Sequence, residues 1–138
     1  MFYVQLVKDL IETEVEDSNE RFTAAVIIVQ NLPNEGSSVI SNESKLVFYS
    51  LYKQSTVGTC QTPKPSFWNV VEKEAWKSLG SMSFKDAQDK YVEMLKVIVD
   101  RAMSENNYVF KLDEDNDVAE VLRKNFEKLG YGAWMNFS

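Results

Sequence analysis

The chain has 138 residues and no histidine. Histidine is the commonest general base and metal ligand, so its absence removes every Ser-His or Cys-His nucleophile pair. The single cysteine, Cys60, excludes an internal disulfide and has no imidazole to activate it. These absences predict a protein that is not an enzyme.

Long apolar runs and a secretory leader are also missing. No run approaches the ~18–20 apolar residues of a membrane span. The first residues, MFYVQLVKDLIE, lack a basic n-region and are interrupted by Lys8 and Asp9. We therefore expect no transmembrane segment and a cytoplasmic setting, which the lone cysteine also favours.

One stretch has part of a metal-binding pattern. Asp113, Asp115 and Asp117 match the first three ligand positions of a calcium loop. Val118 then replaces the required glycine and Lys124 the bidentate glutamate. The stretch is interpreted as a solvated linker or helix start, and we expect neither a metal nor a cofactor.

The charge is unevenly distributed along the chain. The net charge is −6, which argues against a nucleic-acid partner. Residues 45–96 nevertheless contain eight lysines and five acids, so this span carries +3 and the remainder −9. A locally basic region suits a small anionic ligand. On charge alone, solvated helix faces are the simpler explanation of these lysines.

The spacing of apolar residues predicts an all-α protein. Helix starts are indicated at Ser41 or Asn42 and at Ser83. Helix ends are indicated at Pro33, Gly58, Gly80 and Gly130. The expected helices cover about residues 1–16, 17–32, 41–56, 69–79, 83–103 and 118–129. We expect a four-helix bundle over residues 17–103, with an extension at 1–16 and an acidic linker and helix at 104–138.

Apolar periodicity also predicts which side chains face inward. The expected inner side chains are Phe22, Ala25, Val26 and Val29 in the first bundle helix, Ala87, Tyr91, Met94, Leu95 and Ile98 in the fourth, and Val118, Val121, Leu122, Phe126 and Leu129 in the last helix.

The second bundle helix carries polar groups where a core helix would carry leucine. Tyr49 and Lys53 are four residues apart and share a face, with Leu46 one turn before Tyr49. Such a face could hold an apolar chain at one end and a phosphate at the other, with lysine as a point charge and tyrosine as a donor. Ordinary core-edge tyrosines and a snorkelling lysine would give the same pattern.

Three stretches resemble the acyl-CoA-binding protein family. VFYSLYKQSTVGTCQTPKPSFW is similar to the family pattern Tyr-x-x-Tyr-Lys-Gln-Ala-Thr-x-Gly with its Pro-rich turn. EAWKSLGSMSFKDAQDKYVEML resembles the Trp-x-x-Leu-Gly and Ala-x-x-x-Tyr-Val helices, and RFTAAVIIVQNLP the first helix. The resemblance covers about residues 18–103. It is greatest to domain-containing members with extra segments, some of which are peroxisome-associated.

The resemblance implies an up-down-down-up four-helix bundle that binds long-chain acyl-CoA esters. It implies a monomeric carrier and pool former without catalysis or cofactor. In the family, the lysine of Tyr-Lys-Gln and nearby tyrosines hold the 3′-phosphate of the coenzyme. The residues carried over to ligand binding are Lys53, Tyr49, Tyr52 and Tyr91 at the phosphate, Lys73 near it, and Phe22, Ala25 and Leu46 along the acyl groove.

Two departures from the family pattern predict reduced affinity. Gln30 stands where the family usually has a lysine, and FWNVVEKEAW is about three residues shorter and lacks the Trp beside the adenine. Lys73 is the candidate to replace the lysine next to that Trp. Losing a base stack and a charged hydrogen bond would cost about 3–6 kcal/mol, or roughly two to four decades in affinity.

A second hypothesis stays open beside the carrier. The bundle could have lost its ligand and act as a protein-interaction module, with a partner at residues 104–138. Val118, Val121, Leu122 and Phe126 would then form the docking stripe, although these side chains could also pack on the chain itself.

Overall fold

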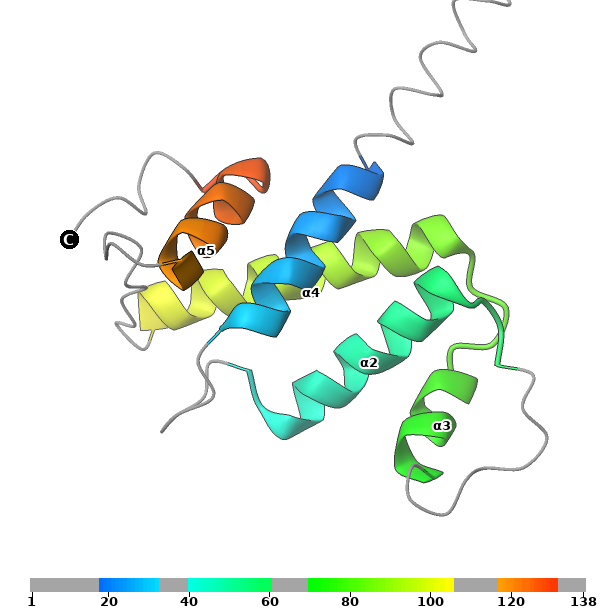
Figure 1. Ribbon diagram of the computed structural model, residues 1–138. Coiled ribbons are helices and arrows are strands. Elements are labelled where there is room, and N and C mark those ends of the chain that lie inside the picture. Colours follow the sequence, from blue (N-terminus) through cyan, green and yellow to red (C-terminus); the bar gives the residue numbers. More distant parts are fainter. Residues whose placement is uncertain (1–17, 33–39, 61–69, 106–116, 132–138) are drawn as a thin grey trace, which may run out of the picture. The chain divides into compact units, whose positions relative to one another are not determined.

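The computed structural model describes residues 18–32, 40–60, 70–105 and 117–131, and every regular element within these ranges is a helix. The first helix covers residues 18–31. The others are α2 (Asn42–Thr56), α3 (Val70–Lys77), α4 (Phe84–Glu105) and α5 (Asp117–Lys128) (Figure 1). The all-α prediction is confirmed in the described ranges, and its helix bounds agree with the structure within about two residues. The expected helix at 1–16 lies outside them.

The chain divides into two compact units. One consists of Leu32–Val109 and contains α2, α3 and α4. The other combines Met1–Asn31 with Phe110–Ser138 and contains the helix at 18–31 and α5. The division of the chain into segments 1–16, 17–103 and 104–138 stays a prediction.

α2 has a well-defined cap at each end. The Ser41 hydroxyl accepts a hydrogen bond from the Ser44 N–H at 3.1 Å, which satisfies one of the open donors of the first turn. At the other end, the N–H groups of Val57 and Gly58 both donate to the Lys53 carbonyl. Gly58 has φ 101°, a conformation that disfavours any side chain. The sequence signals at both ends of α2 are confirmed.

α2 packs against α4 through aromatic and aliphatic side chains. The rings of Phe48 and Tyr91 lie 4.8 Å apart and tilted by 57°, and both residues are buried. Leu51 of α2 and Leu95 of α4 are also buried. The inner face of α4 differs partly from the expected one, because Met94 and Ile98 are only half-buried. The buried positions of α4 are Ala87, Tyr91, Val92, Leu95, Val99 and Ala102.

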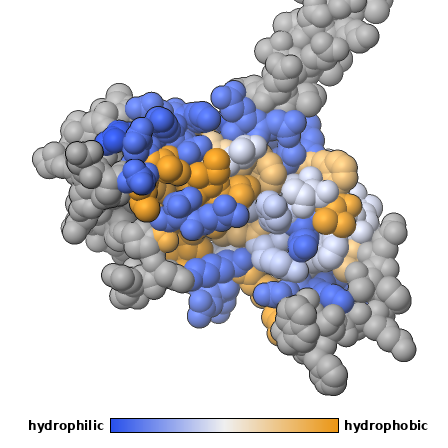
Figure 2. All heavy atoms as spheres, in the orientation of Figure 1, coloured by the Kyte–Doolittle hydropathy of each residue, from blue (hydrophilic) through white to orange (hydrophobic). Residues whose placement is uncertain are grey.

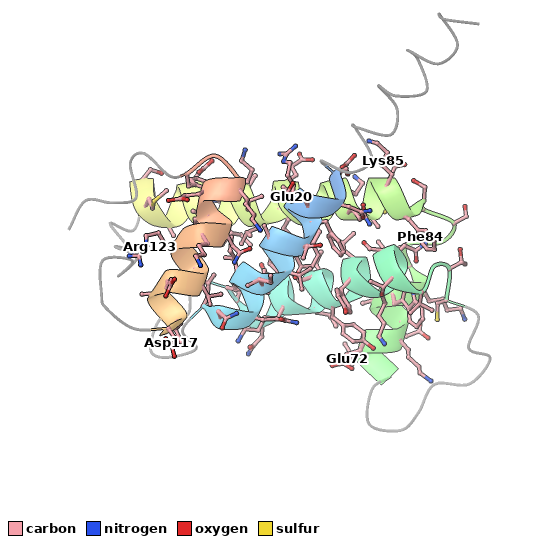
Figure 3. The ribbon with its side chains drawn as sticks, turned by 45° about the horizontal axis from the view of Figure 1, so that its top comes forward. Glu20, Glu72, Phe84, Lys85, Asp117 and Arg123 are labelled. Carbon is pink, nitrogen blue, oxygen red and sulfur yellow. The ribbon has the colours of Figure 1, made fainter. Side chains whose placement is uncertain are left out.

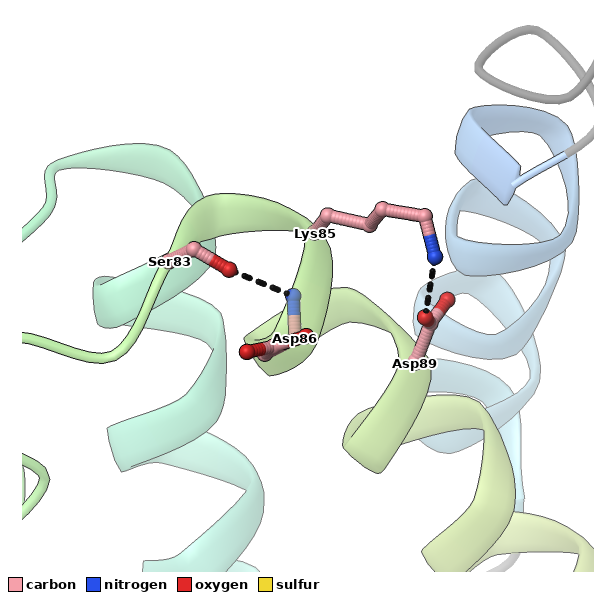
Figure 4. Close-up of polar contacts among 4 residues, drawn as sticks. All are labelled: Ser83, Lys85, Asp86 and Asp89. Atoms are coloured by element: carbon pink, nitrogen blue, oxygen red, sulfur yellow. Dashed lines mark hydrogen bonds and ion pairs between the residues drawn. The ribbon is translucent and has the colours of Figure 1, made fainter. Parts of the chain in front are cut away.

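The start of α4 lies next to the end of α2. Phe84 is half exposed, and its ring lies so close to Gly58 that a Cβ there would be 3.3 Å from it (Figure 3). Ser83 caps α4 by accepting from the Asp86 N–H at 3.1 Å (Figure 4). Lys85 pairs with Asp89 one turn later at 2.8 Å, an exposed pair that contributes little to stability. The predicted start at Ser83 is confirmed.

α3 is fixed to α2 by the amide of Gln54, which has no exposed surface. Its Nε2 donates to the carbonyls of Gly80 at 3.1 Å and Met82 at 2.8 Å, both in the turn between α3 and α4. Its Oε1 accepts from the indole Nε1 of Trp76 at 3.1 Å, and the same indole also donates to the Gly58 carbonyl at 2.9 Å. One side chain therefore connects α2, α3 and the turn that leads to α4.

The helix at 18–31 has a different inner face from the predicted one. Phe22 and Ala25 are buried as expected, together with Ala24 and Ile28. Val26 and Val29 are half-buried, so the buried stripe is rotated from the predicted position.

α5 also differs from its predicted stripe. Leu122, Phe126 and Leu129 are buried with Ala119, whereas Val118 is 51% and Val121 37% exposed. After α5, Gly130 has φ 91° and the Tyr131 N–H donates back to the Phe126 carbonyl at 3.0 Å. The Tyr131 ring then packs edge-on to the Phe126 ring at 5.7 Å. The predicted apolar stripe is therefore buried only in part, and a protein partner at residues 104–138 stays a prediction.

Some large apolar side chains remain exposed in the described ranges. On the face drawn in Figure 2, hydrophobic surface lies in patches between hydrophilic atoms. Val57, Val71 and Phe84 are each more than half exposed. Scattered exposed apolar residues are normal for a folded protein. Among the described helices, none is long and apolar enough to cross a membrane.

Replacing Gln54 tests how much its amide stabilises the fold. We expect Gln54→Ala to lower the free energy of unfolding by about 2–4 kcal/mol, because the carbonyls of Gly80 and Met82 lose their donor and the Trp76 indole loses an acceptor. Urea unfolding followed by circular dichroism measures the change. Gln30→Ala, at an exposed helical position, is the matched control and should stay within about 0.5 kcal/mol. If Gln54→Ala is as stable as this control, the Gln54 amide does not stabilise the fold as proposed.

Alkaline unfolding tests the burial of Tyr91. Burial, with a smaller effect of Tyr52, raises the pKa of the Tyr91 phenol well above its usual 10.0. The folded state therefore keeps a proton that the unfolded chain releases above pH 10, so unfolding becomes easier as pH rises. The contribution is at most about 1.4 kcal/mol per pH unit.

The comparison variant for this test is Tyr91→Phe, measured by urea unfolding from pH 7 to 11. The wild type should lose stability above pH 10 more steeply than the variant. The difference in stability between the two proteins at pH 7 accounts for any other contact of the Tyr91 hydroxyl. Parallel profiles for the two proteins would show that Tyr91 does not titrate differently in the folded state.

Candidate ligand-binding site

The ammonium of Lys53 is held above two aromatic rings. Its Nζ lies 5.8 Å from the centroid of the Tyr49 ring, one turn earlier on α2. It lies 6.0 Å from the Trp76 ring, which comes from α3. Each contact is worth ~0.5–1 kcal/mol at an accessible site. Lys53 is half-buried, so its stem is packed while its charge is available for an anion.

The Trp76 ring is a fixed surface under this ammonium. The indole N–H is shared between the Gln54 amide and the Gly58 carbonyl, and the side chain is 8% exposed. The ring cannot rotate without breaking both hydrogen bonds. The ring thus favours one position of the Lys53 ammonium before a ligand arrives, which lowers the entropic cost of binding.

Tyr49 supplies a neutral hydrogen-bond donor beside Lys53. Its side chain is half-buried. Burial raises the pKa of its phenol above 10.0, and the charges of Glu72 and Cys60 raise it further. The hydroxyl is therefore protonated at neutral pH and can donate to an anionic oxygen.

The other two predicted phenols are Tyr52 on α2 and Tyr91 on α4. Tyr91 is buried against Phe48, while Tyr52 is 39% exposed. Burial raises the pKa of the Tyr91 phenol, and Tyr52 adds a smaller electrostatic effect in the same direction. Tyr91 also stays protonated, so it too can act only as a donor to an anion.

The remaining predicted ligand residues lie on three helices. Leu46 is half-buried on α2 and Lys73 half-buried on α3. Phe22 and Ala25 belong to the helix at 18–31, in the other unit, and are 7% and 0% exposed. Of the predicted ligand residues, the structure brings Tyr49 and Lys53 into contact.

Sequence reasoning missed the roles of Gln54 and Trp76. Both residues stand in the motifs, but neither was assigned to the site. A signal for Gln54 was present, because it lies three residues after buried Leu51, on the inner face of α2. A polar residue on an otherwise buried stripe indicates a specific partner. The pairing with Trp76 depends on how α3 folds back and could not be read from spacing.

The shortened segment before α3 lies largely outside the described residues. Trp68, which could supply part of the missing base stack, belongs to this segment and lies outside the described residues. Gln30, which replaces a family lysine, is exposed on the helix at 18–31. Within the described ranges, no group of three or more His, Cys, Asp or Glu side chains could hold a metal ion.

Comparison with curated proteins identifies relatives over the central part of the chain. It is 51% identical over 83 residues to acyl-CoA-binding domain-containing protein 5 of Xenopus tropicalis, which covers 58% of this chain and 18% of that protein. It is 40% identical over 95 residues to human acyl-CoA-binding domain-containing protein 4, over 67% of this chain and 35% of that protein. The chain thus aligns with about a fifth to a third of these relatives' lengths.

Solved structures show the same fold. Acyl-CoA-binding protein 2 of Oryza sativa superposes with a TM-score of 0.55 at 32% identity, covering 64% of this chain and 97% of that one. The ACBP of Moniliophthora perniciosa gives 0.56 at 30% identity, covering 79% and 92%. Proteins of this kind are four-helix bundles, so the predicted fold class is confirmed. The family model for acyl CoA binding protein matches residues 19–95, more than half of the sequence, and the chain belongs to that family.

Proposed function

We propose that this protein binds long-chain fatty acyl-CoA esters and acts as a non-catalytic carrier and pool former. The observation that carries the proposal is the Lys53 ammonium, held over the Tyr49 and Trp76 rings on an accessible face of α2. Family membership and the relatives named for acyl-CoA binding support the same ligand.

In this proposal, Lys53 binds the phosphate at the nucleotide end of the ligand. Tyr49 donates a hydrogen bond to it from the same helix face. Tyr52 and Tyr91 supply further phenolic donors, and the pKa of Tyr91 is raised so that it remains a donor at neutral pH. Lys73, half-buried on α3, adds a second positive charge. A hydrogen bond to a charged group contributes ~1.5–3 kcal/mol.

The acyl chain would lie against Phe22, Ala25 and Leu46. Burial of the chain contributes ~0.8 kcal/mol per CH₂, so a long chain can dominate the affinity. Leu46 is half-buried and offers surface directly. Ala25 has no exposed surface, so contact with a ligand would require neighbouring side chains to move.

Binding without turnover is the expected activity. The chain has no histidine to act as a general base. We further propose that the protein is a monomer in the cytoplasm. Its affinity for acyl-CoA should be reduced, because the family Trp beside the adenine has no counterpart in the sequence.

Replacing Lys53 tests the phosphate site. We expect Lys53→Ala to weaken binding of palmitoyl-CoA by about tenfold or more, because one charged hydrogen bond is lost. Isothermal titration calorimetry measures the affinity, with free CoA and palmitate as reference ligands. Urea unfolding checks that the variant is folded.

Lys128→Ala is the matched control. It removes the same charge from an exposed position in the last turn of α5 and should leave the affinity within about twofold. Equal affinity of the wild type and Lys53→Ala would refute the phosphate site. If the wild type gives no heat at tens of micromolar palmitoyl-CoA, the carrier function is wrong and the interaction module becomes the better hypothesis.

A further inference from the structure

Glu72 lies on the same side of α3 as the ring that supports Lys53. It stands in the first turn of α3, where it is labelled in Figure 3, and precedes Trp76 by four residues. Residues four apart share one face of a helix. Since the Trp76 ring approaches the Lys53 ammonium to 6.0 Å, this face of α3 is the one directed toward the candidate site.

The electrostatics of Tyr49 agree with this placement of Glu72 on the face of α3 that carries Trp76. Glu72 is the second contributor, after burial, to the raised pKa of the Tyr49 phenol. A carboxylate acts on a phenol in this way only when its charge lies close to the phenolic oxygen. In the proposed function, Tyr49 and Lys53 both contact the phosphate of the ligand. A carboxylate that acts on the Tyr49 phenol would then also act on that phosphate.

Glu72 does not neutralise Lys53 in the structure. No ion pair joins these two side chains in the part of the chain that is described, although their helices pack together. Glu72 is exposed, whereas Lys53 is half-buried and turned to the aromatic rings. The carboxylate is therefore free to act on an incoming anion.

We propose that Glu72 is a specificity-determining residue, whose carboxylate opposes the ribose phosphate of the ligand and lowers affinity for acyl-CoA relative to an ester lacking that phosphate. The inference rests on the proposed acyl-CoA function and deepens it. Lys73, the next residue, partly offsets this charge but projects about 100° around the helix. Repulsion between exposed like charges is modest and screened by salt.

The test pairs two protein variants with two ligands. Glu72→Gln removes the charge and keeps the shape of the side chain. Glu74→Gln removes the same charge from an exposed position two residues on, which points to another face of α3. Both variants and the wild type are titrated with palmitoyl-CoA and with palmitoyl-dephospho-CoA, which lacks the ribose 3′-phosphate.

We expect Glu72→Gln to bind palmitoyl-CoA about threefold or more tightly than the wild type at low salt. The gain should be smaller for the dephospho ester and should shrink at 0.5 M salt, roughly as screening requires. Glu74→Gln should stay within about 1.5-fold of the wild type for both ligands, because its charge lies off the site.

Three results would overturn the inference while leaving the carrier function intact. The first is unchanged affinity in Glu72→Gln. The second is an equal gain in Glu74→Gln, which would report net charge alone. The third is the same gain for both esters, which would mean that the carboxylate does not face the ribose phosphate. If the wild type and both variants bind neither ester, the proposed function itself fails. If only Glu72→Gln binds palmitoyl-CoA, the result supports both the carrier function and the role of Glu72.

Discussion

The amide of Gln54 is the constraint on which the candidate site depends. It is fully buried and uses both ends of its polar group, donating to two carbonyls of the turn after α3 and accepting from the Trp76 indole. A buried amide with these partners is stable in only one orientation, since any rotation leaves a polar group unpaired. The short α3, which has only eight residues, thereby takes a defined position against α2.

The packing of Gln54 also affects the preceding residue, Lys53. Gln54 points inward, and Lys53 projects about 100° away around α2. The inner residue fixes the Trp76 ring, and the ring lies under the Lys53 ammonium at 6.0 Å. Gln54 and Lys53 thus have different roles. The neutral amide determines the geometry, and the charged amine is left available for a ligand. Exchanging their order would bury a charge without a partner, at a large cost in stability.

Much of the fold could be predicted because its helix ends carry local signals. Ser41, Ser83 and Gly58 act within one turn, so their neighbours in sequence are sufficient to place them. The inner faces were harder to predict. In the helix at 18–31, valine, isoleucine and alanine occupy every position from 24 to 29, so periodicity cannot distinguish buried Ile28 from half-buried Val29. In α5, Val118 and Val121 extend the apolar pattern onto an exposed side. Packing partners, which are distant in sequence, decide such cases.

The same division between local and distant information applies to the site. Tyr49 and Lys53 share a face by helical geometry alone, so the motif predicted their pairing correctly. Trp76 and Glu72 reach that face from α3, and no spacing within α2 could indicate them. Their effects on Lys53 and Tyr49 differ in kind: an aromatic ring stabilises a cation at short range, whereas a carboxylate acts on any anion nearby. The charge of a ligand at this site therefore matters as much as its shape, because the Lys53 ammonium lies over two rings and the Glu72 carboxylate acts on the phenol of Tyr49.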